Sequence, residues 1–200
     1  MKFLLAILLL SSCNQNAELG RNDVTHVPKG ITTQTIDDAV IDQIVEYYFE
    51  RFADYDETYN LEKNFSDTVI ELYYSSETIS SGHTVYIGIK PENLVYGDLN
   101  NDGTSDLAMG LYNEYGGSGS NTDVFVFLNE NGRYSLASAI SAYDVSPCEV
   151  HYFLPLKIEK GELLGTSLCY AELDPQCCPS LEVATVLGYQ NGKLELIRKE

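Results

Sequence analysis

The chain has 200 residues, of which 12 are Lys or Arg and 30 are Asp or Glu, so its formal net charge is −18 at pH 7. This charge repels nucleic acid phosphates and anionic lipid headgroups, which excludes nucleic acid as a partner and suits a cation, a basic partner or simple solubility. With 44% hydrophobic residues the chain can bury one core, and a single domain is predicted.

The first 13 residues have the order of parts of a bacterial export signal. Lys2 precedes an unbroken apolar run, Phe3 to Leu10, and Leu10-Ser11-Ser12-Cys13 closes the run with small residues before a cysteine. The run has about half of the roughly 20 residues that span a bilayer, so it is interpreted as a secretory signal. Its end resembles the lipobox of bacterial lipoproteins, at which the signal is cut and the new N-terminal Cys is acylated. We expect a signal peptide over residues 1–12 and a lipid on Cys13, which would hold the exported protein at the cell envelope, on the periplasmic face or the cell surface.

A polar segment and then a helix follow the predicted anchor. Residues 13–34 contain Pro28 and Gly30 and show no periodicity, so they are predicted to form a tether. From Thr35 on, apolar residues recur at spacings of three and four, which predicts an amphipathic helix whose apolar face packs on a sheet. A partner-binding helix is the alternative. The apolar positions are Ile36, Val40, Ile41, Ile44, Val45, Tyr48, Phe49 and Phe52.

The rest of the chain is strand-like. Three tight-turn signals lie between apolar runs: Asn131-Gly132, Lys160-Gly161 and Asn191-Gly192. Asn-Gly favours the positive φ angles of a two-residue hairpin loop, so the C-terminal half is predicted to be an antiparallel meander. Earlier strands are expected near residues 69–74, 84–89 and 94–96. The predicted fold class is α+β, mainly β, with an antiparallel meander sheet and one N-terminal amphipathic helix packed on it, in a single domain of residues 35–200.

One loop carries the clearest chemistry. Residues 97–107 read Gly-Asp-Leu-Asn-Asn-Asp-Gly-Thr-Ser-Asp-Leu, with oxygen-bearing side chains at alternate positions around a glycine. Calcium takes six to eight oxygen ligands, and such a loop turns alternate side chains inward, so a structural Ca²⁺ site is predicted. The expected ligands are the side chains of Asp98, Asn100, Asp102 and Asp106 and the backbone carbonyl of Thr104.

The same loop departs from the EF-hand. Its twelfth position is Met109, where an EF-hand needs a bidentate Glu, and strand-like runs flank it in place of helices. The loop therefore resembles the Asp-x-Asn-x-Asp-Gly-x-x-Asp loops of FG-GAP and VCBS-type β proteins, in which two strands hold calcium. That resemblance implies that Asp106 replaces the missing glutamate. An acidic turn that binds no ion is the alternative.

Four cysteines besides Cys13 are available for pairing in an oxidising compartment, which favours two disulfides. Adjacent residues have Cα atoms about 3.8 Å apart, below the usual range for a disulfide, so cross pairing with the two adjacent cysteines is the simpler geometry. Zinc is the competing interpretation, but it prefers two spaced Cys-x-x-Cys-like pairs. A reducible vicinal disulfide acting as a redox centre is a further alternative. The four residues are Cys148, Cys169, Cys177 and Cys178.

A family resemblance joins three of these motifs. Residues 97–106, Gly116-Gly117-Ser118-Gly119 and the segment Asp174 to Pro179 occur in this order, and the chain is similar to the LppP/LprE lipoprotein family over about residues 93–198. The resemblance implies a compact β-rich domain of unassigned role. Cys148 and Cys169 lie outside the family motifs, which implies that these two pair with each other and leave a vicinal 177–178 bond.

Catalytic motifs are weak by comparison. The segment 116–120 fails the Gly-x-Ser-x-Gly pattern at its last position, and the histidines are isolated in sequence at His26, His83 and His151. The first hypothesis is therefore a non-enzymatic envelope lipoprotein with a calcium-stabilised loop. A calcium-dependent module that binds an envelope protein or a glycan is the second, and an unrecognised hydrolase is the third.

Overall fold

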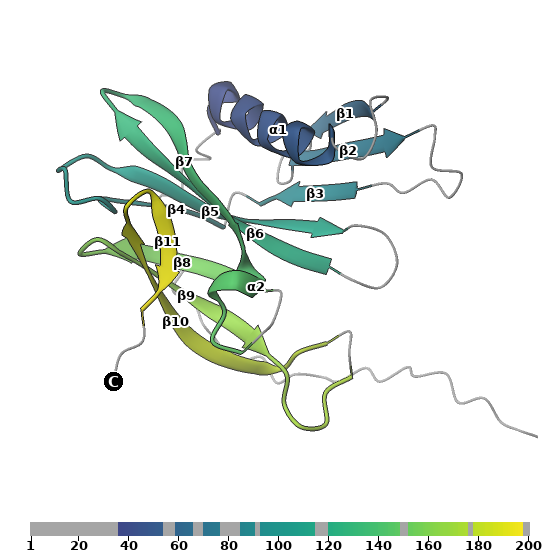
Figure 1. Cartoon of the computed structure of the whole chain (residues 1–200), viewed down its shortest axis with the longest axis vertical. Helices are drawn as coiled ribbons and strands as arrows, with labels where there is room; N and C mark the ends of the chain where they lie inside the picture. The colour runs from purple at the N-terminus through teal and green to yellow at the C-terminus, as the bar shows by residue number, and fades with distance from the viewer. Residues whose placement is uncertain are drawn as a thin grey trace, which may run out of the picture. The chain divides into compact units, whose positions relative to one another are not determined.

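A computed structural model describes residues 36–53, 59–65, 70–76, 85–90, 93–114, 120–148, 152–175 and 178–197. All of them belong to the unit Thr33–Glu200 (Figure 1). The predicted signal peptide, Cys13 and the predicted tether lie outside the described residues. Within the described part, no helix is long and apolar enough to cross a membrane.

Thirteen helices and strands follow one another along the described chain. They are α1 (Asp38–Ala53), β1 (Tyr59–Phe65), β2 (Ile70–Ser76), β3 (Val85–Ile89), β4 (Leu94–Gly97), β5 (Asp106–Glu114), β6 (Ser120–Glu130), β7 (Arg133–Ser141), α2 (Ala142–Val145), β8 (Phe153–Glu159), β9 (Glu162–Cys169), β10 (Leu181–Gln190) and β11 (Lys193–Leu196).

The strands form two antiparallel sheets, which confirms the predicted mainly-β class with a helix on a sheet. Sheet A has the order β1-β2-β3-β5-β6-β7, and β4 also pairs with β5. Sheet B is a meander of the order β11-β10-β9-β8. The sequence pattern predicts the three hairpin turns and most of the strands, but it predicts neither β1 nor this division into two sheets.

The amphipathic helix predicted from Thr35 is confirmed as α1. It begins slightly later because Asp37 caps it: the Ala39 N–H donates to Asp37 Oδ1 at 3.0 Å. Its buried residues recur at helical spacing and pack in the core on one face of sheet A, and Figure 1 shows the helix lying over that sheet. They are Val40, Ile41, Ile44 and Tyr48. The side chains of Phe49 and Phe52 lie outside the described residues.

One side chain fastens α1 to the edge strand β7. Gln43 Nε2 donates to the Tyr134 carbonyl at 2.9 Å, and the Leu136 N–H donates to Gln43 Oε1 at 2.7 Å. The amide therefore bonds to the outer edge of β7 as a neighbouring strand would. An edge strand with unpaired backbone groups is a template for unwanted pairing, and Gln43 occupies part of that edge.

The three predicted hairpin turns are confirmed by their backbone angles. Asn131, Lys160 and Asn191 have φ values of 55°, 57° and 52°, and each is followed by a glycine that also has positive φ. Two successive residues with positive φ suit the right-handed twist of the flanking strands. The turns join β6 to β7, β8 to β9 and β10 to β11.

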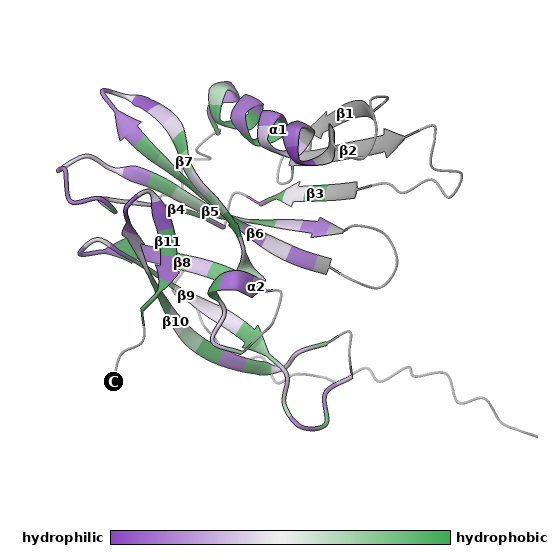
Figure 2. Cartoon of the chain, viewed as in Figure 1, coloured by the Kyte–Doolittle hydropathy of each residue, from purple (hydrophilic) through white to green (hydrophobic). Residues whose placement is uncertain are grey.

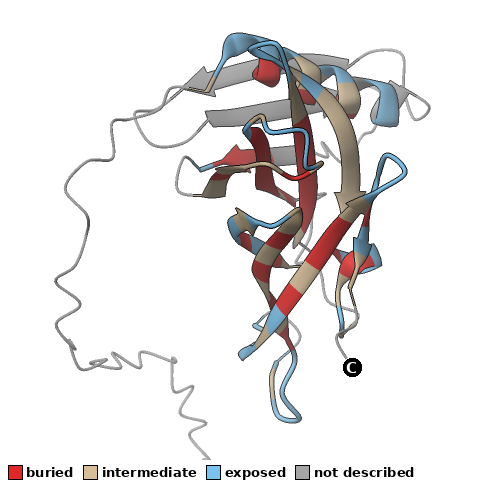
Figure 3. Ribbon diagram, turned by 90° about the vertical axis from the view of Figure 1, so that its left-hand side faces the viewer, coloured by how far each residue is buried: buried red, intermediate tan, exposed pale blue. Residues whose placement is uncertain are grey.

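Sheet A separates two hydrophobic cores because successive residues of a strand point to opposite faces. Leu107, Met109, Phe125 and Phe127 pack with α1 in the first core. Ala108, Val124 and Val126 pack with sheet B in the second core, together with Phe153, Leu163, Leu187 and Leu194. The buried residues of β5 and β6 form the middle layer (Figure 3), and the apolar stretches of both sheets are green in Figure 2. The layer order is therefore α1, sheet A, sheet B.

Candidate metal site

The predicted calcium loop connects β4 to β5, and the Gly97–Asp106 pair closes it. Asn101 and Gly103 have φ values of 59° and 88°, which bend the backbone back on itself. The Asp102 N–H donates to Asp98 Oδ1 and to Asn100 Oδ1, both at 3.0 Å, and the Gly103 N–H donates to Asp98 Oδ2 at 3.0 Å. Two of the predicted ligand oxygens thus converge on one amide inside the loop.

Asp102 is the third predicted ligand, and it is exposed. Its carboxylate accepts hydrogen bonds from Thr104 Oγ1, from the Thr104 N–H at 2.8 Å and from Asn100 Nδ2 at 2.8 Å. The side-chain hydrogen bond from Thr104 is the largest cause that holds the pKa of Asp102 below its ordinary value, followed by that from Asn100. The side chain therefore stays ionised, which is the form that binds a cation.

Asp106, the fourth predicted side-chain ligand, is buried and holds the loop in place. The Leu99 N–H donates to Asp106 Oδ2 at 2.8 Å, and the Asn129 N–H donates to Asp106 Oδ1 at 3.0 Å. One carboxylate therefore links the loop, the start of β5 and the end of β6. Each carboxylate oxygen keeps a second lone pair, so these contacts are compatible with ligation.

The loop also contacts the two neighbouring hairpins. Asn129 Nδ2 donates to the Ser105 carbonyl at 3.1 Å, and Thr104 Oγ1, whose proton faces Asp102 and the Asn129 carbonyl, lies 3.1 Å from that carbonyl, so the loop is fixed to the end of β6. On the other side, Gly161 in the β8–β9 turn lies against the side chain of Asn101, so that a Cβ at this glycine would collide with it. The loop thus lies where sheet A meets a turn of sheet B.

The donor set matches calcium in kind. The five predicted ligand positions supply only carboxylate, amide and carbonyl oxygens, which hard cations prefer. Among the described residues there is no group of three or more His, Cys, Asp or Glu side chains that could hold a metal. The three carboxylates of the loop instead accept backbone and side-chain hydrogen bonds. Calcium at this loop would therefore exchange some of these amide contacts for contacts to the ion, and the site remains a prediction.

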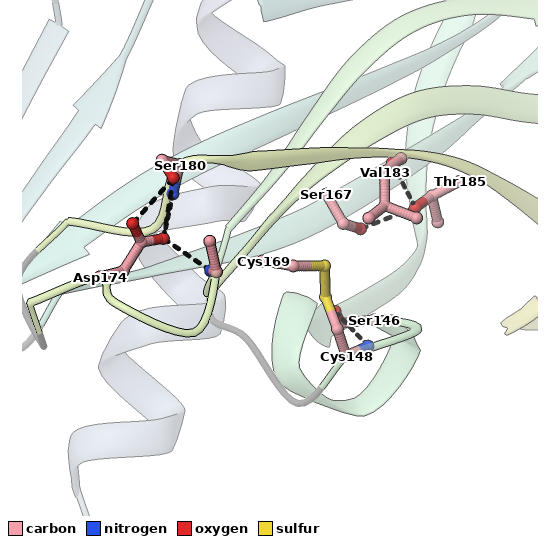
Figure 4. The surroundings of a disulfide bond; sticks show 9 residues. Ser146, Cys148, Ser167, Cys169, Asp174, Ser180, Val183 and Thr185 are labelled. Atoms are coloured by element: carbon pink, nitrogen blue, oxygen red, sulfur yellow. Dashed lines mark hydrogen bonds between the residues drawn. A yellow bond between two sulfur atoms is a disulfide. The ribbon is translucent and has the colours of Figure 1, made fainter.

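A disulfide joins Cys148, just after α2, to Cys169, the last residue of β9, with Cα atoms 5.8 Å apart (Figure 4). This is the pairing that the family resemblance implies, and it excludes the cross pairing of these two with the adjacent cysteines. The pairing of β8 with β9 brings Cys169 next to the segment that precedes Phe153, since the Leu168 N–H donates to the Tyr152 carbonyl at 3.2 Å. Cys178 is also disulfide-bonded, and Cys177 lies outside the described residues.

The disulfide and the loop restrain opposite ends of one strand. The turn before β9 contains Gly161, which contacts the loop, and β9 ends at Cys169. With about 3.4 Å per residue in an antiparallel strand, the two restraints are about 25 Å apart along β9. Near the loop end, a Cβ at Gly97 would lie 2.7 Å from Ile158 Cβ, so β4 and β8 are in close contact there.

A second polar cluster, which the sequence analysis missed, lies under α1. Asp123 on β6 has no exposed surface, and its Oδ2 accepts from Asn113 Nδ2 at 2.7 Å, Tyr48 Oη at 2.8 Å and Arg51 Nη1 at 3.2 Å. Burial is the largest effect on this carboxyl and raises its pKa, although the donors from Tyr48, Arg51 and Asn113 act in the opposite direction.

Two amide oxygens in this cluster have no hydrogen-bond partner. They are Asn113 Oδ1 on β5 and Asn121 Oδ1 on β6, and the two residues lie directly opposite each other in sheet A. Asn121 Nδ2 donates to Ser141 Oγ at 3.0 Å, which extends the polar cluster to β7. The sequence did contain a signal for this cluster. Asp123 is an acidic residue that shares its face of the strand with the apolar Phe125 and Phe127, and a carboxylate at such a buried position needs polar partners.

The other sequence candidates lie outside the described residues. These are Gly116-Gly117-Ser118-Gly119, His26, His83 and His151. No protein-family model, no curated protein and no solved structure matches the chain.

Proposed function

We propose that this chain is an exported, lipid-anchored protein of the bacterial cell envelope with a non-enzymatic role, whose β domain is stiffened by a calcium ion at the Asp98–Asp106 loop. The anchor rests on the sequence from Lys2 to Cys13. The observation that carries the calcium proposal is the loop itself, in which the oxygens of Asp98 and Asn100 face inward and buried Asp106 ties the loop to two strands.

The position of the loop explains what calcium would do there. The loop contacts the β6–β7 hairpin through Asn129 and the β8–β9 turn through Gly161. An ion that draws the loop oxygens together would therefore stiffen the junction of the two sheets. Calcium sites of extracellular modules bind at about 10⁻⁴ to 10⁻³ M, which suits a structural role in a compartment exposed to external calcium.

Thermal melts with calcium and with chelator test the ion. At 10 mM calcium, the affinities above correspond to about 1.4 to 2.7 kcal/mol of added stability, or a midpoint higher by roughly 3 to 10 °C. Asp102→Ala should abolish the increase, whereas Glu195→Gln, at an exposed position of β11, should keep it. An increase equal with magnesium, or no increase with calcium, contradicts the proposal.

Metabolic labelling with radioactive palmitate tests the anchor separately. The wild-type protein should incorporate the label, and Cys13→Ala should not, because the acyl chains attach to this cysteine. Asn14→Ala is the matched control and should be labelled like the wild type. Incorporation of the label into the Cys13→Ala protein would contradict lipid attachment at this residue.

A further inference from the structure

The connection between β9 and β10 holds a concentration of exposed apolar side chains. Leu173 is 94% exposed, and Leu181 and Tyr170, in the same stretch, are 50% and 41% exposed. A single exposed leucine is ordinary on a protein surface. Here half of the large exposed apolar residues of the described chain lie within 12 consecutive positions, and one of them is almost fully in solvent. This stretch is called the β9–β10 tip below and consists of the described residues of 170–182.

Asp174 joins the described residues on the two sides of the tip. Its carboxylate accepts hydrogen bonds from the Ala171 N–H at 2.7 Å, the Ser180 N–H at 2.7 Å and Ser180 Oγ at 2.8 Å, so one side chain joins the two arms of the connection (Figure 4). The Asp174 N–H also donates to the Ala171 carbonyl at 3.1 Å. Leu173 is one of the residues of this turn, and its side chain faces solvent.

The Cys148–Cys169 bond ends at the residue before the tip and fixes the start of this stretch. A surface that is already ordered loses little conformational entropy when a partner binds, which is how rigid loops gain affinity. An apolar side chain displayed on such a loop suits an anchor that enters a pocket on the partner.

The charge of the tip selects the kind of partner. Residues 170–182 contain Glu172, Asp174 and Glu182 and no Lys, Arg or His. The hydrogen bonds from Ala171 and Ser180 keep the pKa of Asp174 below its ordinary value, with the Ala171 N–H as the largest cause. The anchor is therefore surrounded by negative charge, which favours a positively charged rim on the partner. Anionic lipid and a second copy of this chain, at a net charge of −18, are both disfavoured.

The tip and the helix α1 lie on opposite sides of sheet A. The helix α1 covers one face of sheet A, sheet B covers the other, and the tip extends from sheet B (Figures 1 and 3).

From exposure, preorganisation and charge together, we infer that the β9–β10 tip is a docking site for another protein, which offers an apolar pocket for Leu173 surrounded by lysine or arginine side chains. This interaction surface goes beyond the proposed function and does not depend on calcium. Failure of the calcium melt therefore leaves it standing, and failure of docking leaves the calcium site standing.

Site-specific photo-crosslinking of the full chain in intact cells tests the inference. The photoreactive residue p-benzoylphenylalanine is placed at position 173 and, as a matched control, at position 156, since Leu156 is 65% exposed on β8 of the same sheet. We expect one protein adduct of defined mass from position 173 and none from position 156. The double variant Glu172→Lys/Glu182→Lys should reduce that adduct at least fivefold. The same variant should leave the thermal midpoint unchanged because both side chains are exposed.

Other outcomes overturn the inference. These are equal adducts from positions 173 and 156, no protein adduct, an adduct that is indifferent to the charge reversal, or an adduct with the mass of two copies of this chain. A lipid surface is tested with Leu173→Trp, because the chain has no other tryptophan. Its fluorescence should not shift on addition of phosphatidylglycerol–phosphatidylethanolamine vesicles. A blue shift would assign the tip to the membrane and contradict docking to a protein.

Discussion

Asp106 and Asp123 are both carboxylates with no exposed surface in sheet A, yet they are held in different ways. Asp106 accepts from the backbone N–H groups of Leu99 and Asn129, whereas Asp123 accepts from the side chains of Tyr48, Arg51 and Asn113. Backbone donors are fixed once the strands pair, while side-chain donors can turn or exchange roles. Asp106 is therefore expected to be specific for a carboxylate, and Asp123 is expected to tolerate a neutral isostere.

The largest expected effect is that of Asp106→Asn. The new amide carries an NH₂ group that would face either the Leu99 or the Asn129 N–H, and neither backbone donor can become an acceptor. One backbone N–H loses its acceptor and the charge-assisted bonds are lost, so we expect a fall of about 3 kcal/mol in the free energy of unfolding. Urea denaturation at pH 7 measures it. A loss under about 1 kcal/mol would contradict the difference between the two carboxylates.

The effect of Asp123→Asn is expected to be smaller, at most about 1 kcal/mol. The new amide can place its oxygen at the Oδ2 position, where it still accepts from Tyr48, Arg51 and Asn113. The Tyr48 hydroxyl can accept as well as donate, and half-exposed Arg51 can turn to water. Asp123→Leu is the control, because it offers the cluster no polar group and should cost clearly more. If Asp123→Asn lowers the free energy of unfolding as much as Asp106→Asn does, a carboxylate held by side-chain donors does not tolerate a neutral isostere better than one held by backbone donors.

The pH dependence of stability provides a smaller effect of definite sign. Burial raises the pKa of Asp123, so the folded protein binds this proton more tightly than the unfolded chain does. The contribution of Asp123 to stability therefore decreases as the pH rises from about 4 through the folded pKa. Asp102, whose pKa is lowered, has the opposite sign and loses its contribution as the pH falls.

The difference in unfolding free energy between wild type and Asp123→Asn isolates this titration, because both proteins keep Asp102 and the other carboxyls. It should decrease from pH 4 to pH 7 in urea titrations. A difference that is constant or increases over this range would show that the donors around Asp123 outweigh its burial.

The smallest effect on stability is expected for an exposed carboxylate, which serves as a baseline for the two buried ones. Glu159 forms an ion pair with Lys157, with 2.6 Å between Oε2 and Nζ, but both side chains are about half exposed. Water and salt screen such a pair. Glu159→Gln should leave the thermal midpoint unchanged within error, and a clear decrease would mean that exposed pairs of this domain contribute more than their surroundings suggest.

Local features of the fold were predictable because local chemistry determines them. The Asn-Gly and Lys-Gly pairs require positive φ, and residues 131, 160 and 191 have it. The helix follows from apolar spacing and from capping by Asp37. Likewise, the alternating oxygens and Gly103 of the candidate site determine a turn that closes on its own amides.

Features that depend on distant contacts were not predictable. Nothing in the hydrophobic pattern marks where sheet A ends and sheet B begins, because both sheets alternate in the same way. Asp123 meets Tyr48 and Arg51 across more than 70 positions of sequence, and no spacing rule joins residues so far apart. Asp106 holds the calcium loop in place partly through the N–H of Asn129, which is distant in sequence and belongs to a different hairpin.

The Cys148–Cys169 bond has a consequence for the unfolded chain. The two cysteines are 21 positions apart, and the ring that they close contains all of β8 and the turn after it. A ring of this size removes chain entropy that corresponds to about 3 kcal/mol in the loop-closure model. The β8–β9 hairpin is thus favoured before either sheet exists, since its two arms cannot diffuse apart.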